Sequence, residues 1–596
     1  MTTDDQRALH ELATRLGVQV RYHDIWGHEH TASDETLVAI ARALGVALER
    51  VSDAPAALGA LRTLGPGPEA GSPPAEPTQA PVPAPTWGVF VPVYALRSTD
   101  DRGTGTLTHL DALAALVARS GARVVATLPI LATWPDDASP YAPVSRQAWD
   151  EAILDLEHLP GLVHHPEVRD RLPPIRPSSR VVDHPHVAFA VDDAIAHVAT
   201  AVSDDDEVRR AVDELARRRP DLARYAQFRA LADVHGRDWR RWPTIARDAP
   251  LTGAEPGAPA AAVFRYLYGQ LAVEAQLDAL TQRLHDRGQQ LALDLPVGCD
   301  PCGFDTWWHR GDYAAEMSIG APPDPFFAEG QDWGLPPLRP DRARRAGDDD
   351  ALAGALHHHL RYADILRIDH VMGLHRLWWI PAGHDAADGA YVRYPSGASY
   401  DTVVRAARAH DAAIIGEDLG TVEPEVRDAM AHRGILGLWE LQFDADAPAD
   451  AELRVPARPV AVGCNTHDMA TWAGFWTGAD LDEDARLGHA GAGDRERRAE
   501  QVERLATRLA RATDTTVPAT AGAALDAALA FLARSRAAVV IVTLEDLWLE
   551  LHAQNRPGTT DAQRANWRQR VALTLDELDA HPDVQRRLAI LQAARP

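Results

Sequence analysis

The sequence predicts an α/β protein built as a (β/α)8 TIM barrel, with large helical insertions and a small helical region at its N-terminus. Two observations support this fold class. Eight short apolar runs have the composition of buried parallel strands, and segments rich in Ala, Leu and Arg that favour helices lie between them. Strands that alternate with helices form a parallel sheet, and eight of them can close into a barrel.

The predicted strands follow one another along the chain with a helical segment between most pairs. LTHLDALAALVARSG follows the first strand, and SYDTVVRAARAHD precedes the fifth. Loop sequence that is polar or contains glycine follows the strands that end in acidic residues. The eight runs begin at Trp87, Arg123, Leu291, Ala363, Ala412, Gly434, Pro459 and Ala537.

At 596 residues the chain is longer than a bare barrel needs, so the excess must lie in added regions. Residues 1–64 contain two amphipathic helical patterns, and the second begins near Ser33 with the residue types of an N-cap. A linker rich in Pro and Ala over residues 65–86 should be extended and poorly packed. It leads into the catalytic barrel of residues 87–596 and leaves no room for an added β-domain.

Two insertions interrupt the predicted barrel. The stretch from about residue 131 to residue 289 is largely helical in character. The stretch at about 320–340 contains GAPPDPFFAEGQDWGLPPLRP, which is rich in Pro, Gly, aromatic and acidic residues. This composition is typical of an ordered loop, and we expect a lid over a binding cleft.

Composition excludes several classes of function. The formal net charge is -26 and no basic run stands out, which argues against nucleic acid or an anionic membrane as partner. The chain contains no lysine, so a Schiff-base lysine and a Walker lysine are both excluded. We find neither a signal peptide nor an apolar run that could span a bilayer, and we expect a cytoplasmic protein. The sequence favours neither a monomer nor a homo-oligomer.

Three cysteines offer little for a metal site. Cys299 and Cys302 form a C-x-x-C pair, but a zinc site would need two more ligands and Cys464 is the one remaining thiol. Inert thiols near the barrel mouth are the expected alternative. No calcium-loop spacing is visible, so the sequence predicts no metal and no organic cofactor.

Three acidic residues stand at the C-terminal ends of predicted strands. Asp369 follows the fourth strand, Glu417 the fifth and Asp468 the seventh. Each one alone could cap the next helix or pair with an arginine. Together they indicate a catalytic site, because the C-terminal ends of barrel strands meet at one face.

Several motifs make the chain resemble a known family. They are SPYAPVSR (139–146), LDLPVG (293–298), GAPPDPFFAEGQDWGLPP (320–337), LRIDHVMGLHRLWWIP (366–381), YVRYP (391–395), IIGEDLGTV (414–422), NTHDMATWAGFW (465–476) and NRPGTTDAQRANWR (555–568). With these motifs the chain resembles the amylomaltases, the 4-α-glucanotransferases of the disproportionating-enzyme family in the α-amylase superfamily, and its actinobacterial members most closely.

The resemblance implies transfer of α-1,4-glucan segments between maltodextrins by a retaining double displacement. It implies that Asp369 is the nucleophile, Glu417 the general acid and base, and Asp468 the residue that stabilises the transition state. Retaining chemistry of this kind needs two carboxyl groups about 5–5.5 Å apart. The substrate-binding residues implied by the resemblance are Arg367, His467, Asp324, Gln331, Trp333, Tyr141, Asp294 and Asn555.

The residues around the acids suggest how their charges are set. Arg367 lies two positions before Asp369, so both side chains should point to one face of the strand and the guanidinium should favour the ionised carboxylate. Glu417 must instead hold a proton, through burial or a like charge from Asp369 or Asp468. Asp418 should face away. His370 is as easily a packing residue as a ligand.

Tryptophan is abundant near these motifs, as expected for a groove that binds sugar rings. Trp333 lies in a stretch without apolar periodicity, so we favour ligand contact for it. Trp378 and Trp379 follow a strand in an apolar context, and core packing is the better expectation for both.

One position departs from the family pattern. Thr106 stands where many members carry an Asp, which puts donor contacts near that residue in doubt. Two other functions stay open at this point: an α-1,4-glucan hydrolase that uses the same acids with water as acceptor, and a non-catalytic glucan-binding scaffold. A scaffold has no need of all three acids.

Overall fold

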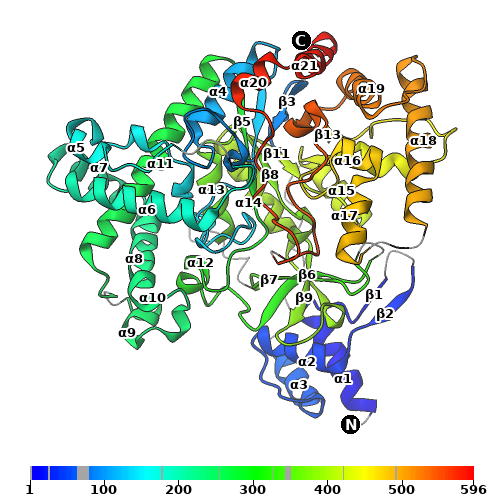
Figure 1. Cartoon of the computed structure of the whole chain (residues 1–596). Coiled ribbons are helices and arrows are strands. Elements are labelled where there is room, and N and C mark those ends of the chain that lie inside the picture. Colours follow the sequence, from blue (N-terminus) through cyan, green and yellow to red (C-terminus); the bar gives the residue numbers. More distant parts are fainter. Residues whose placement is uncertain are drawn as a thin grey trace.

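The computed structural model describes residues 3–23, 27–63, 79–175, 179–253, 256–324, 327–341, 351–420, 422–489, 491, 493–560 and 562–595. At its centre eight parallel strands close into a barrel in chain order (Figure 1). All eight predicted strands are present, which confirms the fold class. They are β3 (Thr86–Phe90), β4 (Val124–Ala126), β5 (Gln290–Leu295), β8 (Ile365–Ile368), β11 (Ala413–Gly416), β12 (Leu436–Glu440), β13 (Val460–Gly463) and β14 (Val539–Thr543).

Helices surround the barrel because their apolar stripes pack on the outward side chains of the strands. Between β13 and β14 the chain forms four helices before it returns to the barrel. The helices on this ring and its edges are α4 (Leu107–Ala118), α12 (Phe304–Trp308), α13 (Ala351–Leu360), α14 (Ser396–Ala409), α15 (Pro424–His432), α16 (Trp472–Thr477), α17 (Ala479–Leu487), α18 (Asp494–Thr513), α19 (Ala521–Arg534), α20 (Leu575–Ala580) and α21 (Pro582–Ala594).

The segment between β4 and β5 is largely helical and forms a lobe beside the barrel (Figure 1). Its last helix, α11 (Ala260–Asp286), packs on α8 of the lobe and also on β5 and α4 of the barrel. This one long helix therefore belongs to both parts. The other helices of the lobe are α5 (Pro166–Arg169), α6 (His184–Ala201), α7 (Asp206–Arg218), α8 (Pro220–His235), α9 (Thr244–Arg247) and α10 (Ala249–Thr252).

The predicted lid at about 320–340 is not a loop throughout. β6 (Met317–Ala321) and β7 (Gln331–Leu335) form an antiparallel hairpin, and β6 also pairs with β9 (Arg376–Pro381). With β10 (Ala390–Arg393) they make a four-stranded sheet. Partners far away in sequence satisfy the backbone groups of the hairpin, and composition alone gives no sign of such pairing.

The N-terminal region contains more structure than the sequence indicated. The two predicted helices are α1 (Thr3–Arg15) and α2 (Asp34–Ala43), and Ser33 caps the second by accepting a hydrogen bond from the Thr36 N–H. A hairpin of β1 (Arg21–His23) and β2 (Glu29–Thr31) and a third helix, α3 (Ala54–Thr63), were not predicted.

Most of the predicted linker lies outside the described residues. Its described end, residues 79–85, forms no helix or strand before β3 begins. Ala80 is nevertheless buried, and its N–H donates a hydrogen bond to the Arg433 carbonyl. The end of the linker is therefore packed against the turn that precedes β12.

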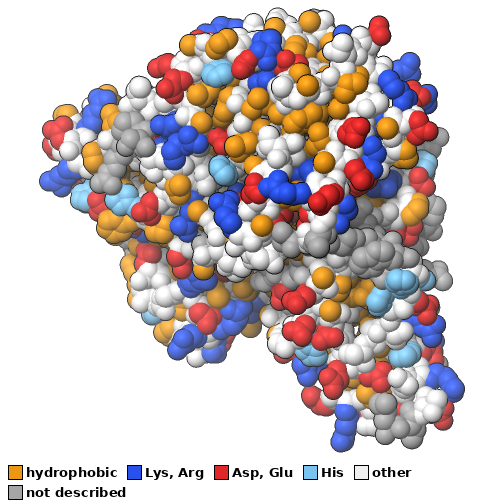
Figure 2. All heavy atoms as spheres, turned by 45° about the vertical axis from the view of Figure 1, so that its right-hand side comes forward, with side chains coloured by type: hydrophobic (Ala, Val, Ile, Leu, Met, Phe, Trp, Pro, Cys, Tyr) orange, Lys and Arg blue, Asp and Glu red, His pale blue; other side chains and the backbone are white. Residues whose placement is uncertain are grey.

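The N-terminal helices share a second hydrophobic core with the four-stranded sheet. Leu37 and Ile40 of α2 lie in it with Ile319 of β6 and Trp379 of β9, and Trp333 of β7 packs at its edge. In Figure 2 this region is the lobe at the lower right, and acidic, basic and histidine side chains are mixed over its visible face. The hairpin that was predicted as a lid is thus supported by the N-terminal region as well as by the barrel.

Trp378 and Trp379 are both buried, which confirms the expectation that they pack in the interior. Within the described part of the chain, no helix combines the length and the apolar character that crossing a bilayer requires.

We predict that Leu37→Ala lowers the free energy of unfolding of the N-terminal region by about 2–5 kcal/mol, since it leaves a cavity in the second core. Leu37 has no exposed surface. Val163→Ala serves as the control, because Val163 is 83% exposed and its truncation should change stability by less than about 0.5 kcal/mol. Chemical unfolding followed by hydrogen exchange measures the free energy of unfolding of both variants. Equal losses in the two variants would contradict the presence of the second core.

Candidate active site

The three acids lie at the C-terminal ends of barrel strands. Asp369 follows β8 and Glu417 follows β11, and these strands are neighbours whose register places Ile368 opposite Gly416. The two acids therefore leave the sheet at the same level. Asp468 lies beyond β13, after a short turn.

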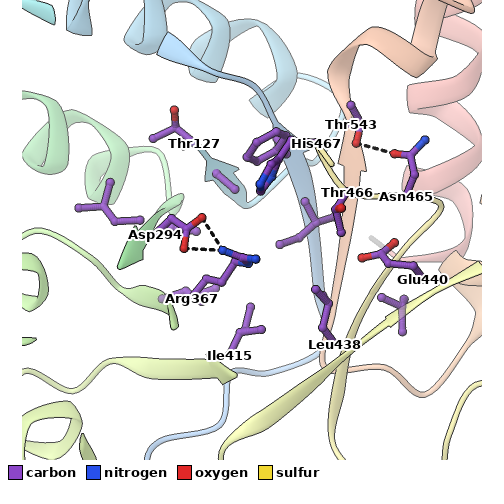
Figure 3. Close-up of a pocket in the computed structure, with 17 residues that line it drawn as sticks. Thr127, Asp294, Arg367, Ile415, Leu438, Glu440, Asn465, Thr466, His467 and Thr543 are labelled. Carbon is purple, nitrogen blue, oxygen red and sulfur yellow. Dashed lines mark hydrogen bonds and ion pairs between the residues drawn. The ribbon is translucent and has the colours of Figure 1, made fainter. Parts of the chain in front are cut away.

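Arg367 lies between two carboxylates. Its Nη1 donates to both carboxylate oxygens of Asp294 at 2.7 Å (Figure 3), and its Nη2 lies 3.0 Å from Oδ1 of Asp369. Arg367 and Asp369 share a side of the strand because side chains alternate along it. Asp294 comes from the adjacent strand β5, and because it and Asp369 bind different nitrogens, the two contacts together orient the guanidinium.

Tyr141 extends this network towards the third acid. Its hydroxyl donates to Asp294 Oδ2 at 2.7 Å and lies 2.8 Å from His467 Nε2. The rings of Tyr141 and His467 stack, and Trp567 packs on both with ring centroids 5.5 and 5.6 Å away. A continuous set of contacts thus joins His467 to Asp369.

Asp468 is held by two neighbours. Asn555 Nδ2 donates to its Oδ1 at 2.7 Å, and His467 Nε2 lies 3.5 Å from its Oδ2. Burial raises the pKa of Asp468, but the histidine and the amide outweigh burial and hold that pKa below its ordinary value. The side chain remains 43% exposed, so the carboxylate is both ionised and accessible.

Asp369 and Glu417 are less exposed, and their pKa values differ. Burial raises the pKa of Asp369 to about 6 against the pull of Arg367. Burial raises the pKa of Glu417 to about 7, and the nearby charge of Asp369 adds to this, while Arg367 opposes it. The sequence expectation that Arg367 keeps Asp369 ionised is therefore met only in part, since desolvation is the larger effect.

Backbone amides also bind Glu417. The N–H groups of His370 and Leu419 donate to its two oxygens at 3.0 and 2.8 Å. His370 has a left-handed backbone conformation with φ 46°, and burial lowers the pKa of its ring to about 4. This role of the His370 amide was missed, because a backbone contact leaves no mark in the sequence. Asp418 faces away and pairs with Arg427 and Arg458.

The lid hairpin brings three further predicted residues near the strands. The Trp333 ring meets the His370 ring edge-on with centroids 5.1 Å apart, and its Nε1 donates to Gln331 Oε1 at 3.4 Å. Asp324 lies at the tip of the hairpin, where its Oδ1 accepts a hydrogen bond from the Phe327 N–H at 2.7 Å. The contact of Trp333 with His370 therefore connects the hairpin to the loop that holds Glu417.

Thr106, the position that departs from the family pattern, has a local structural partner. Thr106 caps α4 together with His109, whose Nδ1 lies 3.0 Å from the threonine hydroxyl. All three cysteines are free thiols, with Cys299 and Cys464 buried. Among the described residues, no group of three or more His, Cys, Asp or Glu side chains is arranged to hold a metal ion.

Comparisons with known proteins identify the family of this chain. The sequence profile of the 4-alpha-glucanotransferase family matches residues 91–574. A 4-alpha-glucanotransferase of Mycobacterium tuberculosis is 34% identical over 529 residues, which cover 81% of this chain and 70% of the relative. A 4-alpha-glucanotransferase of Haemophilus influenzae is 29% identical over 445 residues, which cover 67% of this chain and 62% of that protein.

Solved structures give the same result for the fold. The crystal structure of amylomaltase from Corynebacterium glutamicum matches with a TM-score of 0.82 at 25% identity, covering 98% of this chain and 99% of the other. Amylomaltase from Streptococcus agalactiae, in complex with acarbose, matches with a TM-score of 0.69 at 18% identity and covers 86% and 98% of the two chains. Because the family profile spans most of the sequence, this chain belongs to the 4-alpha-glucanotransferase family and has the transferase activity of that family.

Proposed function

We propose that glucan transfer proceeds by double displacement, with Asp369 as nucleophile and Glu417 as general acid and base. The observation that supports this most directly is the difference between the two carboxyl groups. Asp369 makes a direct ion pair with Arg367, which favours its carboxylate form, whereas Glu417 is bound by two backbone N–H groups and burial raises its pKa to about 7. A retaining enzyme needs both states side by side.

In the first step an Asp369 oxygen attacks C1 of the donor sugar and forms a glycosyl ester. The bond from C1 to the glycosidic oxygen breaks, and Glu417 gives its proton to that oxygen. In the second step Glu417 takes the proton of the acceptor 4-hydroxyl, whose oxygen attacks C1 and releases Asp369. Proton and electron pair balance over the two steps, so no cofactor is needed.

Asp468 is proposed to stabilise the transition state and to bind sugar hydroxyls. Its ionised carboxylate lies beside the reacting pair, where positive charge develops on the sugar ring. Asn555 and His467 fix its orientation. Arg367, Tyr141 and Asp294 would act chiefly by positioning the nucleophile, since their polar atoms bind one another.

The proposed substrates are maltodextrins, as donors and as acceptors. The lid residues Trp333 and Gln331, with Asp324 at the tip, would contact the sugar chain and exclude water from the glycosyl ester. We also place the protein in the cytoplasm, because its three cysteines are free thiols as expected in a reducing compartment.

Glu417→Gln should abolish transfer from maltodextrins but spare the first step for α-glucosyl fluoride, because fluoride leaves with little protonation. A covalent glucosyl adduct on Asp369 should accumulate and be visible by mass spectrometry. Glu425→Gln, an exposed acid on the following helix, is the matched control and should behave as wild type. An adduct on Glu417 or Asp468 in the wild type would overturn the assignment.

Tyr141→Phe should lower kcat about 10- to 100-fold, since loss of one hydroxyl removes contacts to both Asp294 and His467. Steady-state kinetics on maltotriose measures this. Tyr268→Phe removes a comparable hydroxyl, bonded to the Pro160 carbonyl in the helical lobe, and should leave kcat unchanged. A Tyr141→Phe enzyme with wild-type kcat would show that the network does not position the nucleophile.

Trp333→Ala should lower transfer more than hydrolysis, because the lid would no longer shield the intermediate or hold the acceptor. The enzyme is incubated with maltotriose, and glucose, longer oligomers and new reducing ends are quantified. These amounts give the ratio of transfer to hydrolysis. Trp308→Ala, a half-buried tryptophan on α12, is the control. If the ratio stays constant while the rate falls, Trp333 binds the donor or packs, and the shielding role is wrong.

A further inference from the structure

Glu440 is a buried acid that the reaction described above does not use. It is the last residue of β12 and is 3% exposed. It faces a cavity of about 70 Å³ inside the barrel, lined by residues from all eight strands. Arg367, Asp294 and His467 line the same cavity, so it lies next to the network that holds the nucleophile.

The surroundings of the Glu440 carboxyl leave room for it but give its Oε2 no hydrogen bond. Its Oε2 is buried, and within the described part of the structure it has no hydrogen-bond partner. The adjacent residue on β13 is Gly463, where a Cβ atom would lie 2.5 Å from that oxygen. Figure 3 shows Glu440 and Arg367 on opposite sides of the cavity. Because Gly463 has no side chain, the Glu440 carboxyl fits beside it. A hydrogen-bond partner for Oε2 then has to come from the cavity.

The neighbouring charges and burial determine whether Glu440 is ionised or protonated. Arg367 already binds the carboxylates of Asp294 and Asp369. Burial raises the pKa of Glu440 well above its ordinary value, the attraction of Arg367 opposes this, and Asp546 raises the pKa further. A neutral carboxyl can donate and accept hydrogen bonds without competing with Asp369 for the positive charge.

We propose that neutral Glu440 is a positioning residue for Arg367, acting through water held in the cavity between them. The cavity is several times the volume that one water requires, and a bridging water would satisfy Oε2. The inference rests on the proposed role of Asp369. When that residue becomes a glycosyl ester, Arg367 loses an anionic partner, and the water-linked carboxyl keeps the guanidinium in place until the ester is resolved.

The test compares Glu440→Gln with Glu440→Leu. The glutamine amide is neutral and both donates and accepts hydrogen bonds. The kcat of Glu440→Gln should therefore stay within about 3-fold of wild type, and the pH profile of kcat should not move. The leucine offers neither function, so kcat should fall at least 10-fold with KM unchanged. The charged and titratable groups near Glu440 in the described structure are Arg367, Asp294, His467, Asp546 and Cys464.

Gly463→Ala supplies an independent perturbation. Its Cβ would displace the Glu440 carboxyl without changing its chemistry, and it would also lie 3.0 Å from the Ile541 carbonyl. We expect a loss of kcat in the wild-type background and little further loss in the Glu440→Leu background, because the displaced group is then absent. This variant also provides the test if the leucine variant does not fold.

The rate of adduct formation on Asp369 from α-glucosyl fluoride separates this inference from the proposed function. In the Glu417→Gln background, where the adduct persists, Glu440→Leu should still label Asp369, only more slowly. Labelling at the rate of Glu417→Gln alone would overturn the positioning role alone, whereas the absence of any adduct on Asp369 in Glu417→Gln would overturn the proposed function. Two results with Glu440→Gln would also contradict the role of a neutral Glu440. One is a shift in the alkaline limb of the pH profile of kcat, and the other is a loss of kcat as large as that of Glu440→Leu.

Discussion

The site depends on one cation placed among carboxylates inside a barrel. The lining of the mouth is acidic, and Arg367 is the residue that allows two of its acids to lie close together. Removing a partner from a buried ion pair leaves an uncompensated charge, which costs more than the pair contributes. Asp294 and Tyr141 are therefore as much part of the site as the acids that would react.

Burial and charge act against each other at this cation. Desolvation raises the pKa of both Asp369 and Glu417, and Arg367 lowers both. Of the two acids, Asp369 is the one in direct ion-pair contact with this cation. Glu417 receives two backbone hydrogen bonds instead, which orient it without bringing a full positive charge into contact.

The sequence predicted those parts of the molecule that are set by local pattern. Each barrel strand is a short apolar run between helical segments, so all eight were found. The β6–β7 hairpin was not, since its pairing with β9 joins segments about sixty residues apart and its Gly- and Pro-rich composition resembles a loop. The contacts of Trp567, which lies in one of the motifs, and of Glu440 were also missed, because contacts between residues far apart in the chain have no local signature.

The lid and the acids are stabilised by different cores. The acids stand on the barrel, whereas Trp333 packs at the edge of the core formed by the N-terminal helices and the four-stranded sheet. Main-chain pairing of Val18 with Val392 joins the N-terminal region to the four-stranded sheet, and the contact of Trp333 with His370 joins the lid to the loop beside Glu417. A change in the N-terminal core can therefore alter how an acceptor is held while the chemistry of Asp369 stays the same. The helical region at the N-terminus therefore supports the lid that we propose to hold the acceptor, even though none of the three acids lies within it.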